Sequence, residues 1–349
     1  MESPKQSMKR LNISASPRKT VDLANQPLVH MAPYGSGRSF PLVIRPAVES
    51  LDLVGWAAGN KNSIEELLKK HGALLFRDFQ IEDVSNFEKF IQATSRNWVE
   101  YREPATPRNQ VSTNIYTSTE YPADQHIFLH NENSHCEGWP LKIFFYCLLA
   151  PGEAGETPIA DCRRIYQRLD PTIRANFSKR KIKYVRNLGD GLGFSWQTVF
   201  KTSNRLEVEE YCRKAEMGWE WKDENRLRVH YVRPAVIRHP DTGEMSWFNH
   251  GTFFHASTLD PKVRELLTKD FGADNLPYNT YYGDGAEIEP STMDALREAY
   301  HAETIAFPWQ QRDLLMLDNV AVAHGRRPYQ GPRKILVGMA DEYRWDRAS

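Results

Sequence analysis

The stretch IFLHNENSHCEGWPLKIFFYCLL, residues 127–149, decides the fold. It begins with a short apolar run, passes through a polar segment rich in His, Asn and Glu, and ends in an almost continuous apolar run from Leu141 to Leu149. Short apolar runs bounded by polar segments are typical of strands in a β-rich core. We therefore predict two strands here, with the polar residues between them at the mouth of a barrel.

Similar apolar runs lie upstream of this stretch. Ala73 to Phe76 predicts a buried strand. An amphipathic helix capped by Ser63 and stopped by Gly72 is predicted before it, and a second helix from Ile81 to about Thr94 after it. The N-terminal part of the fold should thus contain helices packed beside a strand.

Downstream, short strands alternate with turn residues and a few helical segments. Ile182 to Val185 predicts a strand, and Val236 to Phe248 predicts a hairpin around the turn sequence HPDTGE, residues 239–244. Helical insertions are predicted at Glu207 to Arg213, Pro261 to Lys269 and Ser291 to Glu303. Two late strands, Leu314 to Leu317 and Lys334 to Met339, should be joined by a loop rich in Gly, Arg and Pro.

This distribution of elements predicts a mainly β fold with helical decoration, a double-stranded β-helix or jelly roll, in preference to a parallel βαβ array. Residues 1–25 are polar and show no periodicity, so they predict a disordered or loosely draped N-terminal arm. Residues 26–349 are expected to form one jelly-roll domain with helical insertions.

Composition excludes several classes of function. The 45 Lys and Arg balance the 45 Asp and Glu of this chain of 349 residues, so no overall positive field would attract nucleic acid or anionic lipid. The longest apolar run, Ile143 to Pro151, is about half the ~20 residues that a membrane-spanning helix needs. The four cysteines show no CxxC spacing, which favours buried thiols and a cytoplasmic location. The oligomeric state stays open, a homo-oligomer included.

The candidate chemistry lies in histidines followed two residues later by a carboxylate, because side chains at i and i+2 of a strand point to one side and can share a metal. Four such pairs occur: His130/Glu132, His135/Glu137, His239/Asp241 and His301/Glu303. The last pair lies in a predicted helix, where i and i+2 point about 200° apart, and is expected to be surface decoration. The third lies in the hairpin turn, where solvated polar residues are expected.

Of the remaining two pairs, His130/Glu132 is favoured, although Cys136 keeps the pair His135/Glu137 open as a competitor. The third ligand would be His324, if the last strands close the barrel. Two histidines and one carboxylate leave three positions of an octahedron open, which suits non-haem Fe(II) and dioxygen. Zinc remains chemically possible with the same ligands.

Arginines gather after this histidine, at Arg326, Arg327 and Arg333. A guanidinium at the base of a metal pocket could bind a dicarboxylate, because its planar donors pair with both oxygens of a carboxylate. Arg333 is the best candidate to point inward, since it opens the last apolar strand.

Five segments occur in an order that indicates a known family. They are HGALLFRDF (71–79), LHNEN (129–133), GETPIAD (155–161), WFNHG (247–251) and DNVAVAHGRRPYQGPRKI (318–335). From about residue 40 to the end, the chain resembles the taurine dioxygenase (TauD/TfdA) superfamily of Fe(II)/2-oxoglutarate-dependent oxygenases. The resemblance implies a clavaminate synthase-like jelly roll.

The resemblance also implies roles for particular residues. His130, Glu132 and His324 would hold iron, Arg333 would bind the distal carboxylate of 2-oxoglutarate, and the hydroxyl of Thr157 would help. Dioxygen would be the second cosubstrate, and 2-oxoglutarate would be converted to succinate and CO2 while an unactivated C–H bond is hydroxylated. Because Glu132 supplies a carboxylate where related halogenases leave a gap for chloride, halogenation is disfavoured.

Many relatives carry Asp at the position of Glu132. Glu is similar to the branch that hydroxylates amino acids in nonribosomal peptide biosynthesis, so the expected substrate is an amino acid or a derived small metabolite, free or bound to a carrier protein. Desaturation, cyclisation or oxidative cleavage with the same cofactors are the alternatives, and a catalytically inert jelly-roll binding module is the alternative from another class. Candidate substrate contacts are Asn131, Trp196, Arg233, Asn249 and His250, although relatives often carry Gln where this chain has His250.

Overall fold

The computed structural model describes residues 27–35, 40–99, 108–118, 121–189, 191 and 193–345. The N-terminal arm predicted for residues 1–25 lies outside these ranges. Among the helices in these ranges, none combines the length and the apolar character needed to cross a bilayer.

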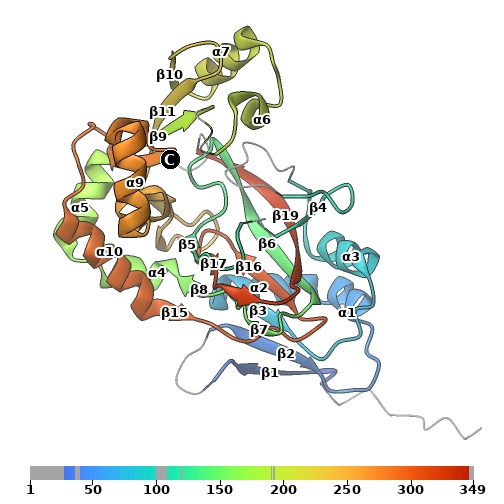
Figure 1. The fold of residues 1–349 in the computed structure, drawn as a ribbon. Coiled ribbons are helices and arrows are strands. Elements are labelled where there is room, and N and C mark those ends of the chain that lie inside the picture. Colours follow the sequence, from blue (N-terminus) through green and yellow to red (C-terminus); the bar gives the residue numbers. More distant parts are fainter. Residues whose placement is uncertain are drawn as a thin grey trace, which may run out of the picture.

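Two sheets form the jelly roll at the centre of the molecule (Figure 1). The larger sheet has the order β1-β2-β3-β16-β6-β19-β4, with β2 and β3 parallel and the other pairs antiparallel. Its strands are β1 Val29–Pro33, β2 Leu42–Pro46, β3 Ala73–Phe76, β4 Ile115–Thr117, β6 Gly138–Leu149, β16 Leu314–Asp318 and β19 Lys334–Arg344. The smaller sheet has the order β15-β8-β17-β5, with β5 Ile127–His130, β8 Ile159–Asp161, β15 Thr304–Ile305 and β17 Val322–Arg326. The predicted jelly-roll class is confirmed.

The continuous apolar run in β6 arises because both faces of this strand are buried. Ile143, Phe145 and Cys147 point into the core shared with the smaller sheet. Phe144 and Tyr146 point to the opposite side and pack against helices. Alternate side chains of a strand face opposite sides, so a strand covered on both faces shows no polar alternation.

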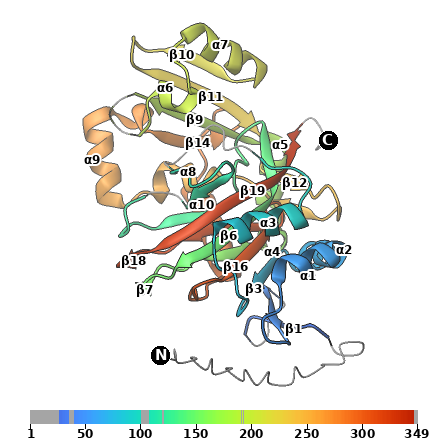
Figure 2. The ribbon, with the colours of Figure 1, turned by 90° about the vertical axis from the view of Figure 1, so that its right-hand side faces the viewer.

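Three helices cover the outer face of the larger sheet, beside β6 and β19 in Figure 2. They are α1 Leu53–Gly59, α2 Lys61–His71 and α3 Val84–Thr94. Helix α2 ends at Gly72, as predicted, in the left-handed conformation with φ 73°. Its predicted start was wrong: the N-cap is Asn60, where α1 also ends, and Ser63 lies inside the helix.

A second layer of strands and helices lies above the jelly roll in Figures 1 and 2. Its sheet has the order β10-β11-β9-β14, with β9 Ile182–Leu188, β10 Gly218–Trp221, β11 Leu227–Arg233 and β14 Tyr278–Tyr282. Its helices, together with those that flank it, are α4 Cys162–Arg168, α5 Pro171–Arg180, α6 Trp196–Phe200, α7 Arg205–Lys214, α8 Gly251–Phe254, α9 Pro261–Phe271 and α10 Pro290–Glu303. The three predicted helical insertions are confirmed as α7, α9 and α10.

Two short antiparallel strand pairs complete the fold. The predicted hairpin is confirmed as β12 Val236–Arg238 paired with β13 Met245–Trp247. The other pair joins β7 Glu153–Ala154 to β18 Tyr329–Gln330. The two late strands are β16 and β19, and both pair with β6. The prediction that a single loop joins them was wrong, because β17 and β18 lie between them in the chain.

Two polar residues expected at the surface are buried. His239, in the hairpin turn, has its Nε2 2.7 Å from Oδ2 of Asp318 at the end of β16. Glu303, at the end of α10, forms ion pairs with Arg164 and Arg168 of α4. Both expectations failed because the partner of each residue lies far away in sequence.

Candidate metal centre and cosubstrate pocket

Two strands of the smaller sheet place the candidate histidines side by side. In the antiparallel pair β17·β5, His324 lies directly opposite His130, and the two imidazole centroids are 4.6 Å apart. A Cβ at Gly325 would meet the carbonyl oxygen of Ile127 at 2.6 Å, so only glycine allows this close approach of the two strands. The register of one strand pair therefore brings together residues 194 positions apart.

The carboxylate of Glu132, in the turn after β5, lies beside the two histidines. Its Oε2 lies 3.6 Å from Nε2 of His324. Among the described residues, His130, Glu132 and His324 form a group whose potential ligand atoms all lie within 4.8 Å of one another, and all three residues are buried. The structure thus brings together the three candidate metal ligands.

Asn319, in the turn between β16 and β17, holds the backbone of Glu132. Its Oδ1 accepts from the backbone N–H of Glu132 at 2.8 Å, and its Nδ2 donates to the carbonyls of Glu132 at 2.9 Å and Pro140 at 2.8 Å. Asn131 adds a further hydrogen bond, because its Nδ2 donates to the carbonyl of Asn319 at 2.7 Å. The position of Glu132 is therefore fixed by a buried amide network.

Electrostatics prepare these side chains to bind a cation. Burial, together with the neighbouring His324, lowers the pKa of His130 to about 3, so the ring is neutral at pH 7. With Nδ1 of His130 donating to the carbonyl of Phe128 at 2.8 Å, the lone pair lies on Nε2. Burial raises the pKa of Glu132, but Arg108, His324 and His130 together outweigh it and hold this pKa well below its usual range. A neutral imidazole beside an ionised carboxylate is the protonation state that metal binding requires.

Arg108 lies in direct contact with this carboxylate. Its Nη2 lies 2.7 Å from Oε2 of Glu132, and the two side chains are 4% and 6% exposed. Arg108 also lines a pocket with His130 and His324. No motif in the sequence marks this residue.

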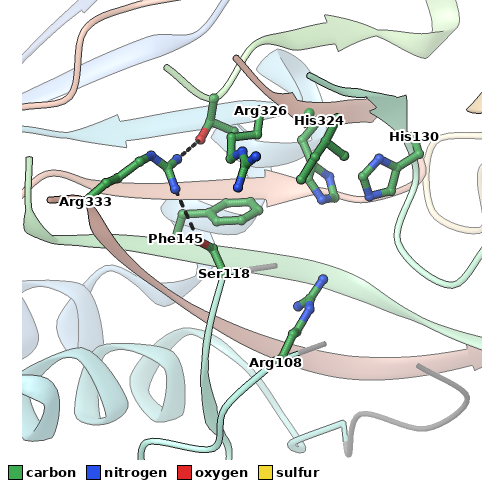
Figure 3. Close-up of a pocket in the computed structure, with 10 residues that line it drawn as sticks. Arg108, Ser118, His130, Phe145, His324, Arg326 and Arg333 are labelled. Atoms are coloured by element: carbon green, nitrogen blue, oxygen red, sulfur yellow. Dashed lines mark hydrogen bonds between the residues drawn. The ribbon is translucent and has the colours of Figure 1, made fainter. Parts of the chain in front are cut away.

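The pocket runs from the histidines to Arg333 (Figure 3). Arg333 donates to the carbonyl of Gly155 at 2.9 Å, to Oγ of Ser118 at 3.2 Å and to Oγ1 of Thr157 at 3.4 Å. It forms no ion pair with a carboxylate of the described residues, and burial lowers its pKa to about 10. The ring of Phe145 forms part of the wall between the two ends. A partly buried guanidinium held by neutral groups is suited to an anionic ligand.

The other two arginines of this segment have different surroundings. Arg326 lines the pocket but donates to the backbone carbonyls of Tyr121, Pro122 and Gln125, so it holds that loop in place. Arg327 is half-exposed, with its Nη1 3.6 Å from Oε1 of Glu156. Of the three, Arg333 has the surroundings expected for a carboxylate-binding residue.

The competing pair does not join the group of three potential ligands. His135 is buried, with its ring 4.6 Å from that of His250 and its Nε2 3.5 Å from Sγ of Cys136. Glu137 is directed away and pairs with Arg344. The preference for His130/Glu132 agrees with this arrangement.

The five candidate substrate contacts fall into two groups. The ring of His250 lies 4.8 Å from that of His130, beside the candidate centre. The other four contact other parts of the protein. Asn131 donates to the carbonyl of Asn319, and Asn249 donates to the carbonyl of Ala235 and accepts from the backbone N–H of Gly251. Arg233 donates to the carbonyls of Val232 and Ala215, and Trp196 packs edge-on against Trp221. None of the five lines the pocket in Figure 3. Their roles in substrate binding stay predictions.

Two residues of the site were not predicted as site residues from the sequence. Arg108 lies in a segment without periodicity, and only the folded chain shows that it reaches Glu132. Asn319 belongs to the last family-like segment, but its contacts with Glu132 depend on the turn between β16 and β17.

Comparisons with known proteins agree with this fold. The family model described as "Taurine catabolism dioxygenase TauD, TfdA family" matches residues 38–340. The dapdiamide synthesis protein DdaC of Enterobacter agglomerans is 39% identical over 80% of this chain and 84% of its own length. A clavaminate synthase-like protein of Arabidopsis thaliana is 27% identical over 91% of this chain and 98% of its own.

Solved structures show the same fold. The crystal structure of PvcB from Pseudomonas aeruginosa covers 93% of this chain and 95% of its own, with a TM-score of 0.56 and 16% identity. A further structure of PvcB, an Fe, alpha-ketoglutarate dependent oxygenase from an isonitrile synthetic pathway, gives the same TM-score and identity.

The chain therefore belongs to the TauD/TfdA family of dioxygenases. It is an oxygenase whose cofactors are iron(II), 2-oxoglutarate and dioxygen.

Proposed function

We propose that the protein hydroxylates an unactivated C–H bond of an amino acid or an amino-acid-derived small metabolite, free or bound to a carrier protein. The observation that carries the proposal is the buried group His130, Glu132 and His324 at one end of a pocket that has Arg333 at the other. Similarity to DdaC, a dapdiamide synthesis protein, supports a role in the synthesis of a small metabolite.

The donor set fits iron(II). Two imidazole nitrogens and one carboxylate oxygen on one side of an ion leave positions for the keto-acid and dioxygen. We assign the three ligand roles to His130, Glu132 and His324. When bound together, iron, 2-oxoglutarate and dioxygen supply the oxidant, with succinate and CO2 as products.

The chain's own residues bind and orient these groups. Glu132 contributes negative charge, and the backbone contacts of Asn319 fix its position. Arg333 would pair with the distal carboxylate of 2-oxoglutarate, and the hydroxyl of Thr157 would accept or donate beside it. Burial of the three ligands and of Phe145 limits access of bulk water to the centre.

The first test asks whether the cofactors bind. Protein incubated anaerobically with Fe(II) and 2-oxoglutarate should show a weak visible charge-transfer band, and it should form succinate once air is admitted. No band and no succinate would contradict the proposal and favour an inert binding module.

The second test identifies the reaction. Amino acids, free and carrier-bound, would be screened by mass spectrometry for the gain of one oxygen atom. Loss of two hydrogens, or fragmentation of the substrate, would instead indicate desaturation, cyclisation or oxidative cleavage with the same cofactors.

We further propose a cytoplasmic location, supported by the four cysteines, which are buried free thiols. Whether the enzyme acts as a homo-oligomer would be measured by size-exclusion chromatography with light scattering.

A further inference from the structure

We propose that Arg108 binds the carboxylate of 2-oxoglutarate that lies next to its keto group, at the metal end of the pocket. This inference rests on the proposed function, because it needs the keto-acid to bind between His130, His324 and Arg333. In this arrangement a guanidinium serves each end of the cosubstrate: Arg333 the distal carboxylate, and Arg108 the carboxylate beside the metal.

The charge of the pocket is the first support. Three arginines line it: Arg108, Arg326 and Arg333. Glu132 pairs with Arg108, whereas neither Arg326 nor Arg333 forms an ion pair with a carboxylate of the described residues. Three guanidinium groups beside one paired carboxylate leave an excess of positive charge at the pocket. Buried charges are costly unless they are paired, so this pocket should bind a ligand with more than one negative charge.

The position of Arg108 is the second support. The oxygen of Glu132 that contacts Nη2 of Arg108 at 2.7 Å is the same oxygen that lies 3.6 Å from Nε2 of His324. A ligand bound to a metal ion beside this oxygen would therefore lie next to the guanidinium. Figure 3 shows Arg108 reaching toward the two histidines from a different side of the pocket than Arg333.

The chemistry of arginine is the third support. A guanidinium presents five donors in one plane, so it can serve Glu132 and a second carboxylate at once. A lysine would supply the charge without the planar fork. Once a metal ion neutralises part of the charge on Glu132, a carboxylate of the ligand becomes the stronger remaining acceptor for Arg108.

This assignment predicts opposite effects on the metal and the keto-acid. In Arg108→Gln, affinity for 2-oxoglutarate should fall about tenfold to a hundredfold, as expected for the loss of a charge-assisted hydrogen bond. Affinity for the metal ion should stay the same or rise, because the variant removes a positive charge that competes at Glu132. If Arg108 only oriented Glu132, metal affinity would fall instead.

The experiment measures both affinities by anaerobic calorimetry, with Mn(II) in place of Fe(II) so that no turnover occurs. Arg327→Gln is the matched control, because it removes a half-exposed arginine from the same end of the fold and outside the pocket; its affinity for 2-oxoglutarate should not change. Arg108→Lys should show an intermediate affinity. If melting curves show that Arg108→Gln does not fold, Arg108→Lys replaces it as the test variant.

Unchanged 2-oxoglutarate affinity in folded Arg108→Gln, or in Arg108→Lys if only that variant folds, would overturn the inference. A fall in Mn(II) affinity that accounts for the loss of keto-acid binding would overturn it too. Failure of the wild-type protein to bind Mn(II) and 2-oxoglutarate would contradict the proposed function itself. If the wild-type protein binds both Mn(II) and 2-oxoglutarate, the affinities of the Arg108 variants test this inference and leave the proposed function untouched.

Discussion

Replacement of Asn319 by alanine tests whether this amide holds Glu132 in position for the metal. The side chain makes three buried hydrogen bonds, two to the backbone of Glu132 and one to the carbonyl of Pro140. At about 1 kcal/mol for each, Asn319→Ala should lower the free energy of unfolding by about 3 kcal/mol. The freed backbone groups of Glu132 would remain buried, which prevents water from restoring the bonds cheaply.

Metal affinity should fall as well, by about tenfold to a hundredfold, as is typical when a residue that orients a ligand is removed. Urea denaturation of the metal-free protein, followed by circular dichroism, gives the first quantity. Calorimetry with Mn(II) on the folded variant gives the second.

Asn187→Ala is the matched control. Asn187 in β9 is also buried and donates to the carbonyls of Asp274 at 3.0 Å and Leu276 at 2.7 Å, away from the three candidate ligands. Its loss should cost about 2 kcal/mol of stability and leave Mn(II) affinity unchanged. If both variants lose stability and both keep full metal affinity, the argument that Asn319 positions Glu132 is refuted.

Three further outcomes are expected. His130→Ala should abolish Mn(II) binding and succinate formation while His135→Ala retains much of both; the reverse order would contradict the ligand assignment. Arg333→Ala should weaken 2-oxoglutarate binding by about tenfold to a hundredfold with metal affinity preserved, as measured by calorimetry, and an unchanged affinity would point to another arginine. Burial lowers the pKa of His239, but the hydrogen bond and charge of Asp318, together with the charge of Asp241, outweigh it and raise this pKa above its usual value. Burial raises the pKa of Asp318, but the hydrogen bond and charge of His239, together with weaker contributions from Ala321 and Arg163, hold it below its usual value. The contribution of His239 to the free energy of unfolding is therefore present at low pH and lost as pH rises through its folded pKa, whereas that of Asp318 is lost in acid. Consequently, His239→Gln should destabilise the protein more at about pH 5.5 than at about pH 8.5. Equal losses of unfolding free energy at both values would exclude a charged pair.

Elements with strong local signals were predictable from the sequence. The strand Ala73–Phe76, the long strand β6 and the helices α9 and α10 follow from apolar runs, helical spacing and proline at a helix start. The resemblance to the TauD/TfdA family added the order of the segments and the candidate site residues. These signals together are sufficient to predict the fold class.

Elements that depend on distant partners could not be predicted in this way. Strand β17 is short and contains Gly325, and it exists because β5 and β8 pair with its two edges. His239 and Glu303 lie in polar stretches of sequence. The partner of His239, Asp318, is 79 residues away. The partners of Glu303, Arg164 and Arg168, are 139 and 135 residues away. The contact of Arg108 with Glu132 likewise results from tertiary structure.

The direct pairing of His130 with His324 also links folding to cofactor loading. Since alternate residues of a strand face opposite sides, a slip of β17 by one position against β5 would turn His324 away from its partner. Such a molecule could be compact and keep its secondary structure, yet it would lack one of the three candidate ligands. If these residues hold the iron, as we propose, the fraction of a preparation that retains iron reports how many molecules have closed the barrel in the correct alignment.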